Sequence, residues 1–169
     1  MADRERPPEN GEPTTYNLLF ICTGNTCRSP MAEVIAQREI RERGWTHVAA
    51  RSAGTMAAAG LPAARAAVRV AADHGLDLSA HRSQPVTPEL VEWADLILAM
   101  GPAHLHAIAE PGVPAAKYAL VTDFGTGEHA GRPIEDPFGG DDETYRRAFS
   151  ELERAIAEVF DRLEPILAP

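Results

Sequence analysis

The chain of 169 residues lacks several features that mark common protein classes. It has only two cysteines, Cys22 and Cys27, too few for the disulfide framework of a small secreted protein. No apolar run approaches the roughly 18 residues that span a membrane, and residues 1–15 are polar and Pro-rich, without the apolar segment of a signal peptide. These absences predict a disordered leader over residues 1–15 and one cytoplasmic domain over residues 16–169, with no membrane partner.

Positive charge is scarce as well. Lysine and arginine total 16 against 25 acidic residues, which gives a formal net charge of −9. An acidic surface repels nucleic acid, so we expect no nucleic-acid partner. The overall field does not attract a phosphorylated ligand either, so a phosphate site in this chain would depend on local groups.

The histidines do not form a metal-binding pattern. His104 and His106 are two residues apart, so on a helix their side chains point in different directions, and His129 stands in a Gly-rich stretch. We therefore expect solvated histidines at these positions, no metal site and no cofactor.

Strand-like and helix-like segments alternate along the chain. Short apolar segments indicate strands at residues 16–22, 48–53, 96–99 and 118–122. Amphipathic or Ala-rich segments indicate helices at residues 30–43, 62–74, 87–93, 102–110 and 141–163. This order predicts an α/β fold, with a single doubly wound sheet of about four parallel strands and helices on both faces.

The segment F-I-C-T-G-N-T-C-R-S-P at residues 20–30 connects the first predicted strand to the first predicted helix. A loop in this position turns successive backbone N–H groups toward one point at a helix N-terminus, which is a binding site for phosphate. It is not a Walker A loop, because the Gly-Lys-Ser/Thr ending is missing. The predicted phosphate-binding residues are Thr23, Gly24, Asn25, Thr26, Cys27 and Arg28.

Cys22 would lie at the base of this cup. The N–H groups and the Arg28 guanidinium would stabilise its thiolate, and Ser29 could donate a hydroxyl hydrogen bond to it. Gly24 and Asn25 are residue types that tolerate the positive φ that such a loop needs. The segment predicts a thiolate aimed at a bound phosphoryl group, with an inert buried cysteine as the alternative.

This segment resembles the active-site loop of the low-molecular-weight protein phosphatases. Residues 51–55, 79–82, 94–100 and 136–140 resemble further blocks of that family in the same order, so the resemblance covers about residues 16–165. It implies a metal-independent hydrolase that acts on phosphorylated proteins through a phosphocysteine intermediate.

A leaving group expelled by the thiolate must be protonated, and a carboxylic acid on a loop would serve. Asp136, in I-E-D-P-F, is the candidate, and the resemblance implies the general acid at this Asp-Pro. The same carboxylate could then deprotonate the water that hydrolyses the phosphocysteine. Alternatively, Asp-Pro is only a turn. Glu135, Asp141 and Asp142 are weaker candidates, the last two because they belong to the first turn of the final helix.

The resemblance also implies two supporting roles. One is a network that holds the loop conformation, in which His81 could equally be a purely structural histidine. The other is a reversible disulfide between Cys27 and Cys22 that protects the nucleophile from over-oxidation, although Cys27 could equally be a small apolar filler. The network residues are Asn25, Ser29, Ser52 and His81.

Two positions bear on the leaving group. Thr26 stands where tyrosine-directed members of the family carry Ile or Leu, and Phe138 is followed by two glycines where those members carry further aromatic residues. This pattern resembles the bacterial protein-arginine phosphatase branch. A phosphoguanidinium gains from a hydroxyl and a carboxylate but leaves N–H groups unpaired against an aliphatic wall.

We therefore expect a phosphatase that hydrolyses protein phosphoarginine, with a protein-tyrosine phosphatase of the same mechanism as the alternative. A thiol-coupled arsenate reductase uses a similar loop but needs more cysteines than this chain has. From another class, a phosphate- or phosphoprotein-binding module without turnover remains an alternative, although a binder needs neither the thiol nor the acid.

Overall fold

Four parallel strands form one sheet in the computed structural model, which describes residues 15–109 and 117–169. The strands are β1 (Tyr16–Cys22), β2 (Val48–Gly54), β3 (Leu96–Ala99) and β4 (Tyr118–Leu120), in the spatial order β2-β1-β3-β4. The predicted leader lies outside the described residues, apart from Thr15. In the described part of the chain, no helix is long and apolar enough to cross a membrane.

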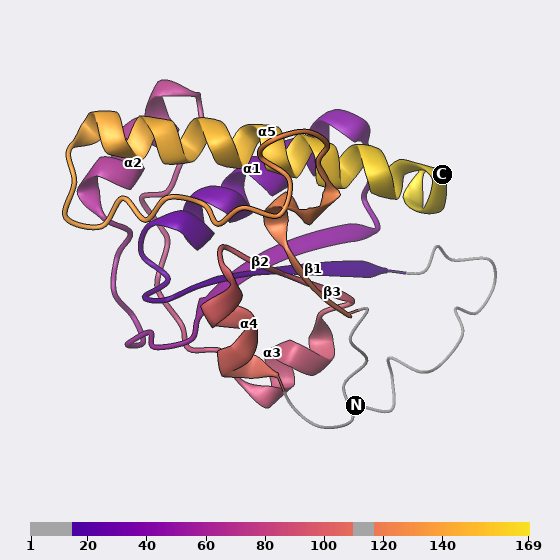
Figure 1. Cartoon of the computed structure of the whole chain (residues 1–169), viewed down its shortest axis with the longest axis horizontal. Coiled ribbons are helices and arrows are strands. Elements are labelled where there is room, and N and C mark those ends of the chain that lie inside the picture. The colour runs from indigo at the N-terminus through magenta and orange to yellow at the C-terminus, as the bar shows by residue number, and fades with distance from the viewer. Residues whose placement is uncertain (1–14, 110–116) are drawn as a thin grey trace.

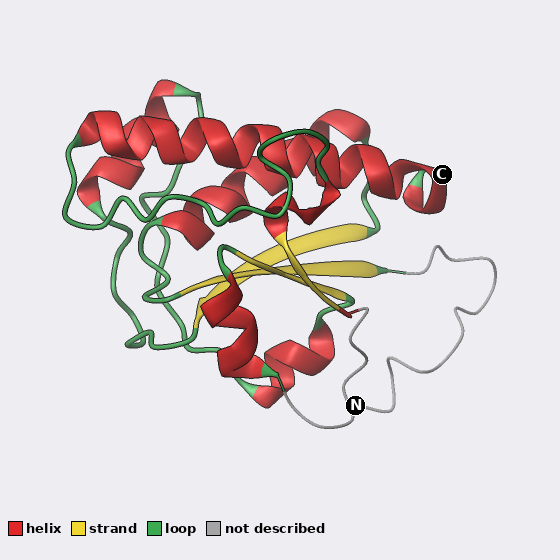
Figure 2. Ribbon diagram, in the orientation of Figure 1, coloured by secondary structure: helices red, strands yellow, loops and turns green. Residues whose placement is uncertain are grey.

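Helices cover both faces of the sheet (Figures 1 and 2). One face carries α1 (Arg28–Arg43), α2 (Arg65–Asp73) and the long α5 (Asp142–Leu167), and the other carries α3 (Pro88–Trp93) and α4 (Pro102–Ile108). A short 3-10 helix, η3 (Val121–Phe124), follows β4. The predicted doubly wound α/β fold with about four parallel strands is confirmed.

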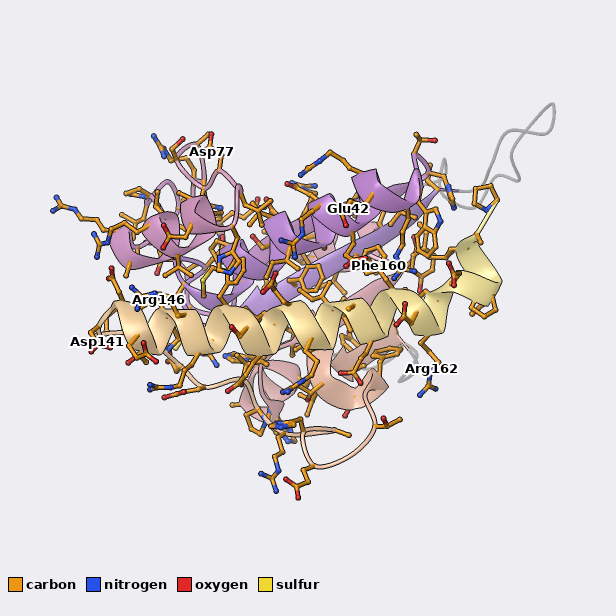
Figure 3. The ribbon with its side chains drawn as sticks, turned by 90° about the horizontal axis from the view of Figure 1, so that it is seen from above. Glu42, Asp77, Asp141, Arg146, Phe160 and Arg162 are labelled. Carbon is orange, nitrogen blue, oxygen red and sulfur yellow. The ribbon has the colours of Figure 1, made fainter. Side chains whose placement is uncertain are left out.

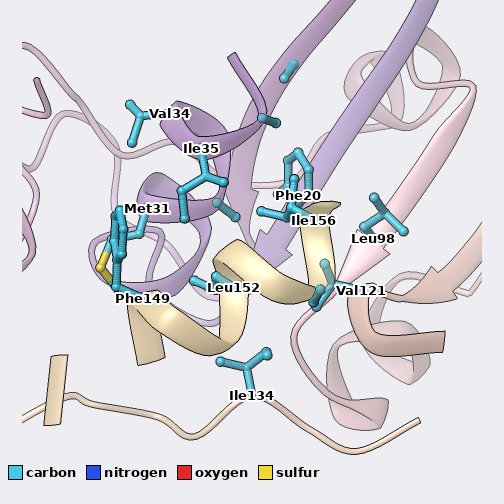
Figure 4. Close-up of a cluster of buried hydrophobic side chains, with 14 of the residues drawn as sticks. Phe20, Met31, Val34, Ile35, Leu98, Val121, Ile134, Phe149, Leu152 and Ile156 are labelled. Atoms are coloured by element: carbon cyan, nitrogen blue, oxygen red, sulfur yellow. The ribbon is translucent and has the colours of Figure 1, made fainter. Parts of the chain in front are cut away.

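The strands of this sheet are buried on both sides because their alternate residues enter two separate cores. Leu18 and Phe20 of β1 face the larger core under α1 and α5, where they meet Ile35, Leu152 and Ile156 (Figure 4). Leu19 and Ile21 face the smaller core under α3 and α4, and all four strand residues are fully buried. β1 is therefore a rigid base for the loop that follows it.

Helix α5 runs along the whole of its face of the sheet (Figure 3). Its N-terminus is capped by the Asp141 side chain, which accepts a hydrogen bond from the Thr144 N–H at 3.0 Å. Farther along, Phe160 lies on the side toward α1 and stacks on Trp45 with 5.6 Å between ring centroids. The N-terminal end of α5 lies near the loop that carries Asp136.

Several predicted boundaries were wrong by two to four residues. α1 begins at Arg28 rather than at residue 30, α2 begins at Arg65 rather than 62, and β4 gives way to η3 at Val121. α5 continues to Leu167, past Pro165, instead of ending at residue 163. Its last turn is held from outside the helix, because Leu167 is buried and its carbonyl accepts a hydrogen bond from His47 Nε2 at 2.8 Å.

The sheet order places a switch point at β1. The chain leaves β1 toward β2 on one side and later returns to β3 on the other, so the connections diverge at the carboxyl ends of β1 and β3. Open α/β sheets bind ligands at such a point. The 22–28 loop begins there, and the Met100 N–H beyond β3 bonds to the Ile21 carbonyl at 3.1 Å.

Candidate active site

A single cavity of about 270 Å³ brings two distant segments together. One is the loop between β1 and α1, and the other is the stretch before α5 that contains the Asp-Pro turn. Almost all residues that the sequence predicted for the nucleophile, phosphate, acid and specificity roles line it. They are Cys22, Thr23, Gly24, Thr26, Cys27, Arg28, Asp136 and Phe138.

A chain of hydrogen bonds supports the Cys22 sulfur. Ser29 Oγ lies 2.9 Å from Cys22 Sγ, and Asn25 Nδ2 donates to Ser29 Oγ at 2.8 Å. Because the amide fills one lone pair of the hydroxyl, the Ser29 proton can be directed at the sulfur, or more weakly at the Ala53 carbonyl 3.5 Å away. The arrangement suits a negatively charged sulfur, which a hydroxyl donor stabilises.

Asn25 is the residue around which the loop is folded. It is fully buried and has a φ of 57°, the left-handed conformation that asparagine tolerates. Its amide also donates to Ser52 Oγ at 3.0 Å and accepts from the Gln84 N–H at 3.0 Å, so every hydrogen-bonding group of the side chain is used. The expected positive φ is thus found at Asn25.

Gly24 does not share that conformation, which corrects the expectation for it. A Cβ at this position would meet only Thr26 Oγ1 at 3.7 Å, an ordinary contact. The glycine that the loop requires for steric reasons is Gly54, at the end of β2. A Cβ there would collide with the Thr23 carbonyl oxygen and lie 2.9 Å from the Asn25 nitrogen, so β2 can approach the loop only as glycine.

Ser52 and His81 both reach the loop through Asn25. Ser52 Oγ receives the Asn25 amide and donates to Glu33 Oε1 at 2.8 Å, and burial raises the pKa of Glu33. His81 Nε2 donates to the Asn25 carbonyl at 2.7 Å. The structure thus brings Asn25, Ser29, Ser52 and His81 into one connected set and adds Glu33, which the sequence alone did not single out.

Arg28 connects the two segments of the cavity. It is 7% exposed; Nη1 donates to the Ile134 carbonyl at 3.1 Å, and Nη2 lies 3.5 Å from Asp136 Oδ2. Both Nη atoms of the guanidinium therefore contact the acid-bearing loop, and Arg28 also lines the cavity. A fork of this kind can bind two oxygens of a phosphate at once.

The two carboxylate oxygens of Asp136 have different surroundings. Oδ1 accepts the Phe138 N–H at 3.1 Å, which closes the turn, while Oδ2 faces Arg28. The two interpretations of Asp-Pro, as a simple turn and as the position of the general acid, are therefore compatible. Asp136 forms a turn and also presents an oxygen to the cavity. Its side chain is 55% exposed and is accessible to water.

The other carboxylates near this loop are engaged elsewhere. Glu135 pairs with Arg147 at 3.3 Å, Asp141 caps α5, and Asp142 pairs with Arg69 at 2.7 Å. The expectation that Asp141 and Asp142 belong to the start of the final helix is confirmed. Among these four, Asp136 alone lines the cavity.

Cys27 is a buried free thiol with an unexpected partner. Its sulfur lies 3.2 Å from the hydroxyl of Tyr145, in the first turns of α5, and Thr26 Oγ1 is farther away at 3.8 Å. Burial raises the pKa of the Cys27 thiol, so it is protonated at neutral pH. Burial and the contact with Cys27 raise the pKa of Tyr145 as well. Tyr145 carries no sequence signal beyond an aromatic position on the buried face of a helix.

His104 is not solvated, and that expectation was wrong. It is 7% exposed, and its Nε2 lies 3.0 Å from Thr23 Oγ1 in the phosphate-binding loop. A signal was present in the sequence, because His104 stands four residues before the apolar Ile108 in the predicted helix, on the face that the structure buries. His106 and His129 are exposed, as expected. Over residues 15–109 and 117–169, no group of three or more His, Cys, Asp or Glu side chains could hold a metal ion.

Comparisons with known proteins agree with this geometry. The family model described as low molecular weight phosphotyrosine protein phosphatase matches residues 17–166. A protein-arginine-phosphatase of Bacillus subtilis is 38% identical over 149 residues, which are 88% of this chain and 97% of that protein. Low molecular weight protein-tyrosine phosphatase A of Mycobacterium tuberculosis is 34% identical over 90% of this chain and 94% of its own length.

The fold comparison gives the same result. A solved structure of the YwlE arginine phosphatase from Geobacillus stearothermophilus superposes with a TM-score of 0.78 at 38% identity, and the match covers 89% of this chain and 94% of that one. With a family match over nearly all described residues and a thiol, an arginine and a carboxylate in one cavity, the chain belongs to the low molecular weight phosphotyrosine protein phosphatase family, whose members use a cysteine-based mechanism.

Proposed function

We propose that this phosphatase removes the phosphoryl group from phosphoarginine in proteins. The observation that carries the proposal is the meeting of Cys22, Arg28 and Asp136 in one cavity whose wall includes the polar side chain of Thr26. Cys22 is the nucleophile, Arg28 binds the phosphate, and Asp136 is the general acid and base. Backbone N–H groups of residues 23–28 complete the phosphate site.

The reaction has two steps in this assignment. The Cys22 thiolate attacks phosphorus; an S–P bond forms, the P–N bond to the guanidine breaks, and the protonated Asp136 gives its proton to the leaving nitrogen. Asp136, now a carboxylate, then takes a proton from water as the water oxygen attacks phosphorus. The S–P bond breaks, inorganic phosphate leaves, and the thiolate is restored.

The preference for a guanidine leaving group is supported by the polarity of the cavity wall. Thr26 is half-buried in the cavity lining, and among the described residues its hydroxyl has only the distant Cys27 sulfur as a hydrogen-bonding partner, so it is available to a ligand. Phe138 is 79% exposed at the rim and is followed by Gly139 and Gly140 rather than by further aromatic residues. The relatives named as arginine phosphatases support the same choice, and those named as tyrosine phosphatases keep the phenol alternative open.

The direct test compares kcat/KM on phosphoarginine and phosphotyrosine peptides of the same sequence, with Cys22→Ser as the inactive control. A preference for phosphoarginine supports the proposal. A preference for phosphotyrosine keeps the mechanism and overturns the substrate. Phosphate binding without hydrolysis of either peptide would instead support a binding module.

Thr26→Ile is expected to change the substrate preference. The substitution replaces a hydroxyl in the wall with an aliphatic group, which leaves guanidinium N–H groups unpaired but packs well against a phenol ring. We expect the ratio of kcat/KM for phosphoarginine over phosphotyrosine to fall by about ten-fold or more. Thr26→Val, which removes the hydroxyl at nearly constant volume, separates the loss of polarity from the gain in size. An unchanged ratio in both variants would show that Thr26 does not select the substrate.

We also propose that Cys27 is the redox partner of Cys22. Both thiols are free and line the same cavity, which supports the pairing. Formation of the disulfide joins two sulfurs and releases two protons and two electrons to an oxidant such as hydrogen peroxide or oxidised glutathione. Cys27 would then leave Tyr145, whose buried hydroxyl has no other partner among the described residues.

Tyr145→Phe is therefore expected to favour the disulfide. An unsatisfied buried hydroxyl costs about 1–3 kcal/mol, and the wild-type protein meets that cost only in the oxidised form. We expect the ratio of oxidised to reduced protein, at equilibrium in a glutathione redox buffer, to rise by about ten-fold. Thiol labelling followed by mass spectrometry measures it, and Cys27→Ser controls for oxidation without an internal partner. Equal ratios in wild type and Tyr145→Phe would show that Tyr145 does not oppose formation of the disulfide.

Three further assignments follow from the composition. Two free thiols, one of them the proposed nucleophile, support a reducing compartment, so we propose the cytoplasm as the site of action. The net charge of −9 argues against nucleic acid as a partner, and the relatives named as protein phosphatases support phosphorylated proteins instead. Residues 16–169 are proposed as the catalytic domain, with residues 1–15 as a leader outside it.

A further inference from the structure

His104 stands in the first turn of α4, on the opposite side of the sheet from α1, yet its side chain reaches the phosphate-binding loop. Both ring nitrogens are used. Nδ1 is 3.1 Å from the backbone nitrogen of Gly101, the N-cap of α4, and Nε2 is 3.0 Å from Thr23 Oγ1. The ring thus joins the beginning of one helix to the residue that directly follows the proposed nucleophile.

These two contacts define the protonation state of the ring. The Gly101 N–H can only donate, so Nδ1 must carry a lone pair, and the proton of the neutral ring resides on Nε2. Burial lowers the pKa of His104 and the nearby Arg28 cation lowers it further, while the Asp136 carboxylate acts in the opposite direction. The ring is therefore neutral at pH 7, and Nε2–H donates to the Thr23 hydroxyl oxygen.

Thr23 is held at two points. Its carbonyl accepts the Met56 N–H at 2.9 Å, which fixes the backbone, and His104 holds the hydroxyl. The side chain is otherwise exposed, and an exposed threonine rotates among its rotamers unless something holds it. With one lone pair occupied by His104, the hydroxyl keeps a second lone pair and its own proton for a ligand in the cavity that Thr23 lines.

The hydroxyl of Thr23 complements that of Thr26. Both belong to the cavity wall, and Asp136 adds a carboxylate. A guanidine leaving group carries several N–H donors spread over a plane, and each needs an acceptor once it is withdrawn from water. A phenol leaving group carries no N–H and gains nothing from a second acceptor.

We propose that Thr23 is a specificity-determining residue that contacts the guanidine of the substrate, and that His104 is the positioning residue that holds the Thr23 hydroxyl toward the cavity. The inference rests on the proposed arginine phosphatase activity. His104 acts only through Thr23, so the two residues form one functional unit. Loss of the contact costs one neutral hydrogen bond on phosphoarginine and almost nothing on phosphotyrosine.

The experiment compares variants at both positions on phosphoarginine and phosphotyrosine peptides. Thr23→Val removes the hydroxyl and Thr23→Ser keeps it. His104→Asn retains an acceptor near the position of Nδ1 for the Gly101 N–H but cannot reach Thr23, whereas His104→Gln places an amide N–H near the position of Nε2. His106→Asn, an exposed histidine on the same helix, is the matched control.

We expect Thr23→Val and His104→Asn each to lower kcat/KM on phosphoarginine by about ten-fold, the value of one neutral hydrogen bond. The double variant should lose no more than either single one, because the interaction is already absent. The loss on phosphotyrosine should be several-fold smaller than the loss on phosphoarginine, and Thr23→Ser and His104→Gln should recover most of the phosphoarginine activity. Thr23→Val changes an exposed side chain, so the proposal remains testable even if a His104 variant unfolds in a thermal melt.

Three results would overturn the inference. Equal losses on the two peptides would mean that His104 and Thr23 only stiffen the loop. Losses that add in the double variant would mean that the two residues act separately. A Thr23→Val variant as active as wild type on phosphoarginine would show that the Thr23 hydroxyl does not contact the guanidine of the substrate. The wild-type protein reports on the parent proposal in the same experiment, because failure to hydrolyse phosphoarginine at all would refute that proposal before any variant is compared.

Discussion

Cys22→Ser is expected to lower kcat on phosphorylated peptides by about 10⁴-fold or more, the scale of loss seen when an enzymic nucleophile is removed. A serine hydroxyl at this position is neutral at pH 7 and is a far poorer nucleophile than a thiolate held by a hydroxyl donor. The loop itself should survive the change, since Asn25 and Ser29 hold it without the sulfur.

The substitution therefore separates catalysis from binding. Inorganic phosphate should still bind to Cys22→Ser with an affinity within a few-fold of wild type, measured by calorimetry, because the backbone N–H groups and Arg28 are unchanged. Cys27→Ser is the matched control: it alters the other thiol of the same loop and should keep most of the turnover. In wild type, rapid quenching should trap a phosphoryl group on the peptide that contains Cys22. A Cys22→Ser protein that still turns over would point to a different nucleophile.

The sequence contained most of the architecture because the elements that matter are short, apolar and clearly separated. β1 was predicted with its observed bounds, since Leu18 to Ile21 are buried on both faces of the sheet and read as an unbroken apolar run. The phosphate loop was recognisable because its residues are contiguous. Asp136 was recognisable by chemistry and resemblance, although 108 positions separate it from Arg28.

What could not be predicted depends on tertiary contacts that leave no local pattern. The carbonyl of Ile134 as a partner of Arg28 is a backbone group, which any residue would supply. The helices that carry Tyr145 and His104 were predicted from the sequence, but the contacts of these two side chains with Cys27 and Thr23 were not. The last turn of α5 continues past Pro165 because His47 and the core hold it, and local propensity argues against it.

The backbone conformations of Gly24 and Gly54 also depend on tertiary contacts that the local sequence does not indicate. From the sequence, both Gly24 and Asn25 were expected to tolerate the positive φ that the loop needs, and only Asn25 adopts it. The close approach that excludes a side chain occurs at Gly54, at the end of a strand 30 residues from Gly24. Such a requirement arises only when two segments meet, so the sequence around Gly54 gives no indication of it.

Asp136→Asn is expected to lower kcat on peptide substrates by about 10²- to 10⁴-fold, the contribution of general acid–base catalysis. Asparagine is nearly isosteric, and its side-chain oxygen can still accept the Phe138 N–H, so the turn should persist. Both chemical steps lose their proton carrier. The loss should be small for an aryl phosphate with an acidic phenol, because such a leaving group departs without protonation, and this dependence distinguishes a lost acid from a distorted loop.

Phosphate binding should change in the opposite direction. In the free protein, the Asp136 carboxylate lies 3.5 Å from Arg28 and competes with a phosphate dianion for the guanidinium, besides repelling that dianion directly. Removal of the negative charge should lower the inhibition constant of inorganic phosphate while kcat falls. Asp141→Asn is the control, because asparagine caps a helix as well as aspartate does and Asp141 does not line the cavity. If kcat and phosphate affinity fell together in Asp136→Asn, the residue would be supporting the shape of the site, and the acid would have to be sought among other groups.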